Sequence, residues 1–95
     1  MSQPEIEITL TERGGTHGEF CFNSAISQLI KAAVRTGSKW AVMTPCQREA
    51  LDMIAHKMGR ICEGDPNFQD HWHDIEGYAK LAKDRIYKST PVGLP

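Results

Sequence analysis

Apolar residues recur at helical spacing in three segments of the chain, with polar residues between them. The first segment, 19–36, carries the stripe Phe22, Ile26, Leu29, Ile30 and Ala33. The second, 44–63, carries the longest stripe, formed by Leu51, Ile54, Ala55, Met58, Ile61 and Cys62. The third, 70–87, carries Trp72, Ile75, Ala79, Ala82 and Ile86. This spacing predicts three amphipathic helices whose apolar stripes form the core.

Polar residues at the segment ends favour the same boundaries. Thr16 and Glu19 have the spacing of a capping box, in which two side chains satisfy two free amides at a helix start. Thr44 and Gln47 have the same spacing at the start of the second segment. Gly64 follows that segment and predicts its end.

Residues 5–11 have a different pattern, because apolar side chains there alternate with polar ones. No second segment of this kind exists to pair with it, so we expect either pairing with a strand outside its own chain or an extended arm. The predicted organisation is a single domain, 1–95, with an arm at 1–15, helices within 16–88 and a flexible tail at 89–95. We therefore expect an all-α, three-helix domain that completes a helical bundle by dimerisation.

The length, net charge and cysteine content of the chain exclude several classes of protein. The chain has 95 residues, which gives one domain with a thin core. Its 11 Lys and Arg residues against 12 Asp and Glu give a net charge of −1, which argues against binding duplex nucleic acid. Three scattered cysteines predict a reducing compartment. No apolar run has the length of a signal peptide or a membrane span, so we expect a cytoplasmic protein.

Two polar stripes lie opposite the predicted core faces. On the second helix the stripe consists of Glu49, Asp52, Met53, His56 and Arg60. On the third helix it consists of Asp70, Asp74, Gly77, Leu81 and Asp84, with Tyr78 beside it. Both stripes could be ordinary solvated faces. Gly77 argues otherwise, because a glycine inside a helix costs roughly 1 kcal/mol relative to alanine and favours close approach of a backbone or ligand.

The stripe on the second helix combines carboxylates with an imidazole and a guanidinium. Such a set could hold a divalent cation and the phosphates that the cation bridges. A transition-metal site would instead use His56, His71 and His73. Residues two apart on a helix point about 200° apart, so one metal cannot easily take both His71 and His73. Cys46 has no His or Asn placed to make it a nucleophile.

The segments "EALDMIAHKMGRI" (49–61) and "DHWHDIEGYAKLA" (70–82), with "RGGTHGEF" (13–20) before them, resemble a group of small phage and prophage proteins whose domain has no assigned function. More distantly, the two-helix pattern is similar to the all-α nucleotide pyrophosphohydrolases of the MazG and dUTPase type. Those enzymes hold magnesium with acidic residues on two helices and release pyrophosphate. The phage resemblance implies the cytoplasm of a host cell.

The resemblance to the pyrophosphohydrolases implies that Glu49 and Asp52 correspond to the acidic pair on the first of their two helices. It implies that Asp74 corresponds to the last metal-binding aspartate, on the second helix. The chain departs from the enzymes at His71, where they have Glu, and at Arg48, where they have the first of two acidic residues. Asp70 is a further candidate ligand. Lys57 and Arg60 would contact phosphates, and His56, His71, Gly77 and Tyr78 would line the pocket.

These observations predict a phage-type accessory protein with a pocket for a nucleotide and Mg²⁺, for which Mn²⁺ could substitute. Nucleoside-triphosphate pyrophosphohydrolase activity is one expectation, without an assigned catalytic residue. The alternative is a non-enzymatic phage protein that binds a host factor or sequesters a nucleotide. We expect a homodimer in either case, and no contact with a membrane.

Overall fold

The computed structural model describes residues 14–89, with side chains described as far as residue 86. Its long helices are α2 (Phe20–Arg35), α3 (Pro45–Glu63) and α4 (Gln69–Ser89), and the short 3-10 helix η1 spans Trp40–Val42. The prediction of an all-α domain with three long helices is thus confirmed for this part of the chain. Gly14, Gly15 and Ser89 have helical backbone, and the rest of the predicted arm and tail lies outside the described residues.

The helix starts follow local chemistry. Thr44 and Gln47 form the predicted capping box, in which the Thr44 hydroxyl accepts from the Gln47 amide at 3.2 Å and the Gln47 side chain accepts from the Thr44 amide at 2.9 Å. The predicted box at Thr16 is wrong. Gly18 has a φ of +82°, which ends the helical turn at residues 14–17, and Glu19 alone caps α2 by accepting from the Phe22 amide.

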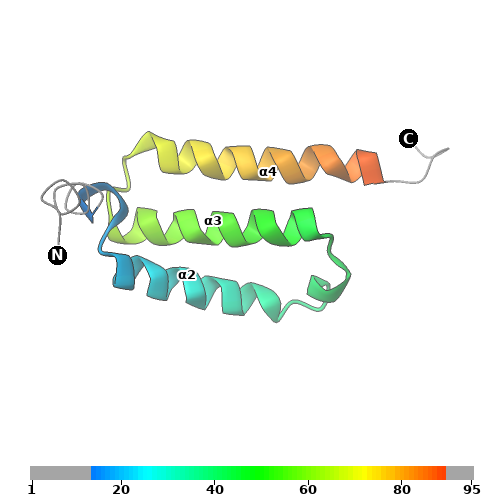
Figure 1. Ribbon diagram of the computed structural model, residues 1–95, viewed down its shortest axis with the longest axis horizontal. Helices are drawn as coiled ribbons and strands as arrows, with labels where there is room; N and C mark the ends of the chain where they lie inside the picture. Colours follow the sequence, from blue (N-terminus) through cyan, green and yellow to red (C-terminus); the bar gives the residue numbers. More distant parts are fainter. Residues whose placement is uncertain (1–13, 90–95) are drawn as a thin grey trace, which may run out of the picture.

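The three helices lie side by side in one layer (Figure 1). α3 lies between α2 and α4 and runs antiparallel to both, and each outer helix packs against α3. Packing on two opposite sides of α3 leaves both broad faces of the layer uncovered within the described residues. No helix in this part of the chain has both the length and the apolar character to cross a membrane.

The contact between α2 and α3 is made by small and polar residues. Asn23 and Ser27 of α2 are buried against α3, where Ala55 and Gly59 are also buried. A side chain at Gly59 would collide with the carbonyl oxygen of Asn23, so the absence of a side chain lets the two helices approach closely. Asp52 extends this contact by forming an ion pair with Arg35 at 3.0 Å.

The contact between α3 and α4 corrects the predicted core stripe of the third helix. Trp72 was expected in the core but is 54% exposed, and its indole nitrogen donates to the Pro66 carbonyl at 2.8 Å. The neighbouring His71 is buried instead, and Lys57 reaches Asp74 at 2.9 Å. The centre of the predicted stripe lies about 60° around the helix from His71, so the buried side of α4 is rotated by roughly that angle, and Ile75 and Ala82 stay partly buried.

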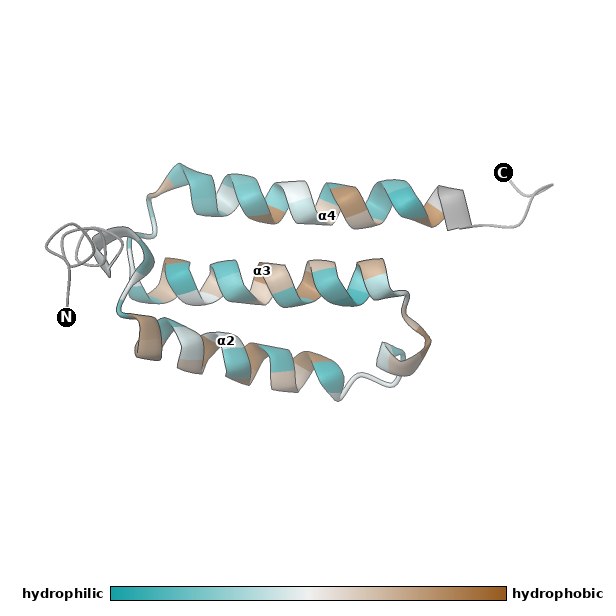
Figure 2. Ribbon diagram, in the orientation of Figure 1, coloured by the Kyte–Doolittle hydropathy of each residue, from teal (hydrophilic) through white to brown (hydrophobic). Residues whose placement is uncertain are grey.

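The packing of α3 decides what each broad face carries. Gly59 faces α2 and Lys57 faces α4. Because successive residues differ by about 100°, Met58 lies on one open face, and His56 and Arg60 lie on the other. We call these the apolar face and the polar face. Figure 2 shows that every helix carries both hydrophobic and hydrophilic residues along its length.

The same helical geometry shows which residues of the outer helices, α2 and α4, lie on each face. Asn23 of α2 faces α3, so the antiparallel direction of α2 places Phe22 and Leu29 on the apolar face. His71 of α4 is buried, which places Trp72 and Ile86 on that face too. The polar face consists of the two stripes predicted from the sequence. Its members are Glu49, Asp52, Met53, His56 and Arg60 of α3, with Asp70, Asp74, Gly77, Leu81 and Asp84 of α4.

Candidate functional site

The four carboxylates predicted to bind magnesium are distributed over the polar face. Asp52 lies toward α2 and pairs with Arg35, whereas Asp74 lies on α4 and pairs with Lys57. Glu49 and Asp70 are exposed. Among the residues that the structure describes, no group of three or more His, Cys, Asp and Glu side chains could hold a metal ion. Within one chain, the predicted cation ligands are therefore not assembled in advance.

Basic side chains gather around His56 in the middle of the polar face. Partial burial lowers the pKa of His56, and the positive charges of Arg60, Lys31 and Lys57 lower it further. The predicted phosphate ligands Lys57 and Arg60 thus belong to one electrostatic group. Lys31 was missed by the sequence analysis, because it lies on α2 and joins the group only when α2 packs against α3.

Two acidic residues beside this group, Asp52 and Asp74, differ in which of their carboxylate oxygens already have a partner. One carboxylate oxygen of Asp52, Oδ2, accepts from Arg35, while Oδ1 is buried and has no hydrogen-bond partner among the described residues. The hydrogen bond from Lys57 lowers the pKa of Asp74, and the charge of Lys57 adds to that effect. Asp74 therefore neutralises part of the basic group, and Asp52 keeps one oxygen that has no partner among the described residues but is closed to solvent.

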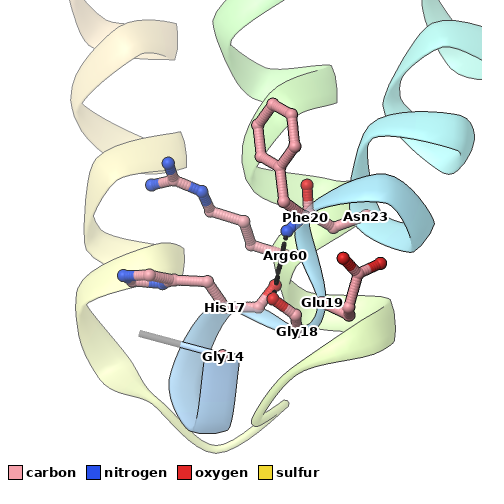
Figure 3. Close-up of a pocket in the computed structure, with 7 residues that line it drawn as sticks. All are labelled: Gly14, His17, Gly18, Glu19, Phe20, Asn23 and Arg60. Atoms are coloured by element: carbon pink, nitrogen blue, oxygen red, sulfur yellow. Dashed lines mark hydrogen bonds between the residues drawn. The ribbon is translucent and has the colours of Figure 1, made fainter. Parts of the chain in front are cut away.

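A pocket of about 560 Å³ opens at one end of the layer (Figure 3). It lies between the turn at residues 14–17, the start of α2 and the side chain of Arg60. The Asn23 amide donates to the His17 carbonyl at 3.0 Å and fixes one wall. The volume falls in the ordinary range for small-molecule sites. Its lining residues are Gly14, His17, Gly18, Glu19, Phe20, Asn23 and Arg60.

The remaining predicted pocket residues have different surroundings. His71 is 1% exposed and its ring bonds to His17, so it supports the fold and does not face a ligand. His73 is exposed, as expected for rings that diverge on a helix. A side chain at Gly77 would meet nothing within 4 Å. Tyr78 and Glu49 share a smaller hollow of about 240 Å³ between α3 and α4.

No protein-family model matches the chain, and no curated protein or solved structure matches it significantly. The resemblance to phage proteins and to pyrophosphohydrolases stays a prediction from the sequence. The geometry of the polar face and of its pocket therefore carries the functional argument.

Proposed function

We propose that the polar face binds the phosphate groups of a nucleotide together with a divalent cation, as an accessory protein of the phage type. The observation that carries this proposal is the group of three cations, Lys31, Lys57 and Arg60, whose charges act on His56. Phosphate oxygens are strong acceptors for Lys and Arg. The adjoining pocket, lined by Arg60, has room for the remainder of the nucleotide.

The cation would bind together with the nucleotide. Mg²⁺ usually keeps several waters and is held by one or two carboxylates and the phosphates of the substrate. A cluster of three protein ligands is not needed for that kind of binding. Asp52 is the candidate carboxylate, because its Oδ1 atom has no hydrogen-bond partner among the described residues, and this buried atom would have to become accessible when the cation binds. Mn²⁺ favours the same oxygen ligands and should substitute.

Thermal melting with nucleotides and metals tests this proposal. Wild-type protein should be stabilised by a nucleoside triphosphate with Mg²⁺, by about 2.7 kcal/mol when the ligand is at a hundred times its dissociation constant. For a chain of this size that is a rise of roughly 10 °C or more in Tm. Inorganic phosphate alone should give a smaller rise, because it lacks the contacts of the pocket.

A pair of lysine variants provides the control. Lys31→Gln removes a member of the basic group and should lose most of the rise. Lys39→Gln removes an exposed lysine next to η1 and should keep it. Equal melting temperatures for wild type across Mg²⁺, Mn²⁺ and all the common nucleotides would contradict the proposal.

Release of pyrophosphate separates the two forms that this function can take. An enzyme of the pyrophosphohydrolase type would release pyrophosphate from the nucleotide that stabilises it, and activity would depend on the metal. A protein that only sequesters the nucleotide would be stabilised by it, and no pyrophosphate would be released. A docking surface for a host protein would show neither effect.

A further inference from the structure

The apolar face is exposed over all three helices. Its large side chains are not packed against the rest of the chain, since Leu29 is 72%, Phe22 63% and Trp72 54% exposed. Met58 and Ile86 are 40% and 49% exposed. Single exposed apolar residues are normal on proteins, but an uncharged patch that extends over three helices marks an interaction site.

Covering this face would add to the stability of the layer. Among the described residues, Ala50 and Ala55 are the fully buried apolar side chains, and larger ones such as Ile26, Leu51 and Ile54 are only partly buried. Burial of large apolar side chains is the main favourable contribution to folding, and two alanines contribute little of it. A partner on the apolar face that is always available would therefore supply much of the apolar burial that one chain lacks.

We infer that this partner is a second copy of the chain, which packs its own apolar face against the first to form two layers of three helices. A second copy is made together with the first, so it is always available. A two-fold axis brings the same patch of both copies into contact. The interface would contain the exposed members of the stripes that the sequence pattern assigned to a core, such as Phe22, Leu29, Met58 and Trp72.

The size of the face agrees with a dimer interface. α3 has 19 residues, and a rise of about 1.5 Å per residue gives it a length of about 28 Å. Three helices spaced roughly 9 Å apart give a width of about 27 Å. The face then covers on the order of 750 Å², close to the roughly 800 Å² that each partner contributes to a standard stable interface.

The charge of the face is also compatible with self-association. The positions of α2 and α3 on this face hold no Asp, Glu, Lys, Arg or His residue. On α4 the two charged side chains at the outer edge, Glu76 and Lys83, are of opposite sign. Two copies can therefore meet without repulsion between like charges.

The residues at the start of the chain are a less suitable cover. Residues 1–13 contain four large apolar side chains, Met1, Ile6, Ile8 and Leu10. Four side chains are too few to cover a face that is three helices wide. The face thus needs a partner with its own broad apolar surface.

Two Leu→Lys variants of the full chain test the inference by static light scattering. Wild type should have about twice the chain mass of 10.6 kDa at 10–100 µM. Leu29→Lys places a charge on the apolar face and should abolish the dimer. Leu81 is a matched control, because it is 50% exposed but lies on the polar face, and Leu81→Lys should keep the dimer mass.

Leu29→Lys could also prevent folding, so the melting of wild type provides a second measurement. If folding and association are coupled, Tm should rise by about 3 °C for each tenfold increase in protein concentration. A folded wild-type monomer at 100 µM with a constant Tm would overturn the inference. So would a dimer that Leu81→Lys breaks and Leu29→Lys leaves intact. A folded monomer would leave the proposed nucleotide site untouched. A dimer that depends on Leu81 would instead place the interface on the polar face, and the nucleotide melts would then show whether that face still binds its ligand.

Discussion

The Nε2 atom of His71 lies 3.0 Å from Nδ1 of His17 and 3.2 Å from the carbonyl oxygen of Thr16. Because that carbonyl can only accept, Nε2 of His71 donates to it in the tautomer that carries a proton on Nε2, and Nδ1 of His17 is then a second acceptor within reach. The edge of Phe68 packs against both rings, with centroids 6.1 Å from His17 and 4.9 Å from His71. The pair joins the turn at residues 14–17 to the start of α4.

His71→Ala should lower the free energy of unfolding by about 2–4 kcal/mol, because it leaves a cavity and removes the hydrogen bonds at Nε2. The exposed His73 lies on the same helix and offers a matched control. His73→Ala should change stability by no more than about 0.5 kcal/mol. Urea melts at one protein concentration measure both values. Equal losses in the two variants would show that the buried pair contributes nothing special.

Gly59 and Gly77 should respond oppositely to replacement by alanine. Alanine usually stabilises a helix relative to glycine by about 1 kcal/mol. At Gly59 the new methyl group would collide with the Asn23 carbonyl oxygen, so we expect a net loss of about 1–3 kcal/mol. At Gly77 nothing lies within 4 Å, so we expect a gain of about 0.5–1 kcal/mol.

The signs of these two changes, read from denaturant melts, check the packing of the layer. A gain in the Gly59→Ala variant would mean that α2 and α3 are farther apart than in the structure. A loss in the Gly77→Ala variant would favour the expectation from the sequence, that another backbone or a ligand approaches α4 at this point.

The sequence predicted the helices better than it predicted their contacts. Boundaries depend on local signals such as the Thr44 capping box, and these signals act wherever the helix packs. A helical stripe shows which residues share a face, but it does not show which face meets a neighbour in the same chain. The apolar stripes were assigned to the core, yet the structure leaves Leu29 and Met58 exposed and buries Asn23 and Ser27 between helices.

The sequence predicted some residues of the candidate site and missed those that depend on contacts between helices. The polar stripe of α3 identified Arg60, and the resemblance to the pyrophosphohydrolases suggested Lys57, which the structure places toward α4. Lys31 was missed, since its proximity to His56 depends on contact between α2 and α3. The ion pair of Asp74 with Lys57 was also missed, for the same reason on the other side of α3.

Gly18→Ala should destabilise the end of the layer where the pocket lies. Gly18 has a φ of +82°, which costs an alanine about 1–2 kcal/mol, and the added methyl group would lie within 3 Å of Glu63 at the end of α3. Gly15→Ala is the control, because a side chain there meets nothing within 4 Å. The melting temperature should fall in the first variant and stay the same or rise in the second. A common response would mean that the backbone at Gly18 can rearrange freely.

The pH dependence of stability should reveal the basic group around His56. Its pKa in the folded chain is lowered from 6.5 by burial and by the charges of Arg60, Lys31 and Lys57. Below about pH 6.5 the unfolded chain therefore takes up a proton that the folded chain does not, and the free energy of unfolding falls as the pH falls toward the folded pKa. His56→Gln removes this contribution, so the variant should lose less stability than wild type between pH 7.5 and 5.5.

Chemical denaturation at several pH values measures that difference, with His73→Gln as a control for the loss of a histidine outside the basic group. Parallel curves for wild type and His56→Gln would contradict the arrangement of charges around His56.

The same pH measurement, repeated with a bound nucleotide, also tests the proposed phosphate site. Phosphates bound among the three cations would offset their charge and raise the pKa of His56, because a nearby negative charge favours the protonated imidazole. The loss of stability below pH 6.5 should then be smaller with a saturating nucleotide than without it.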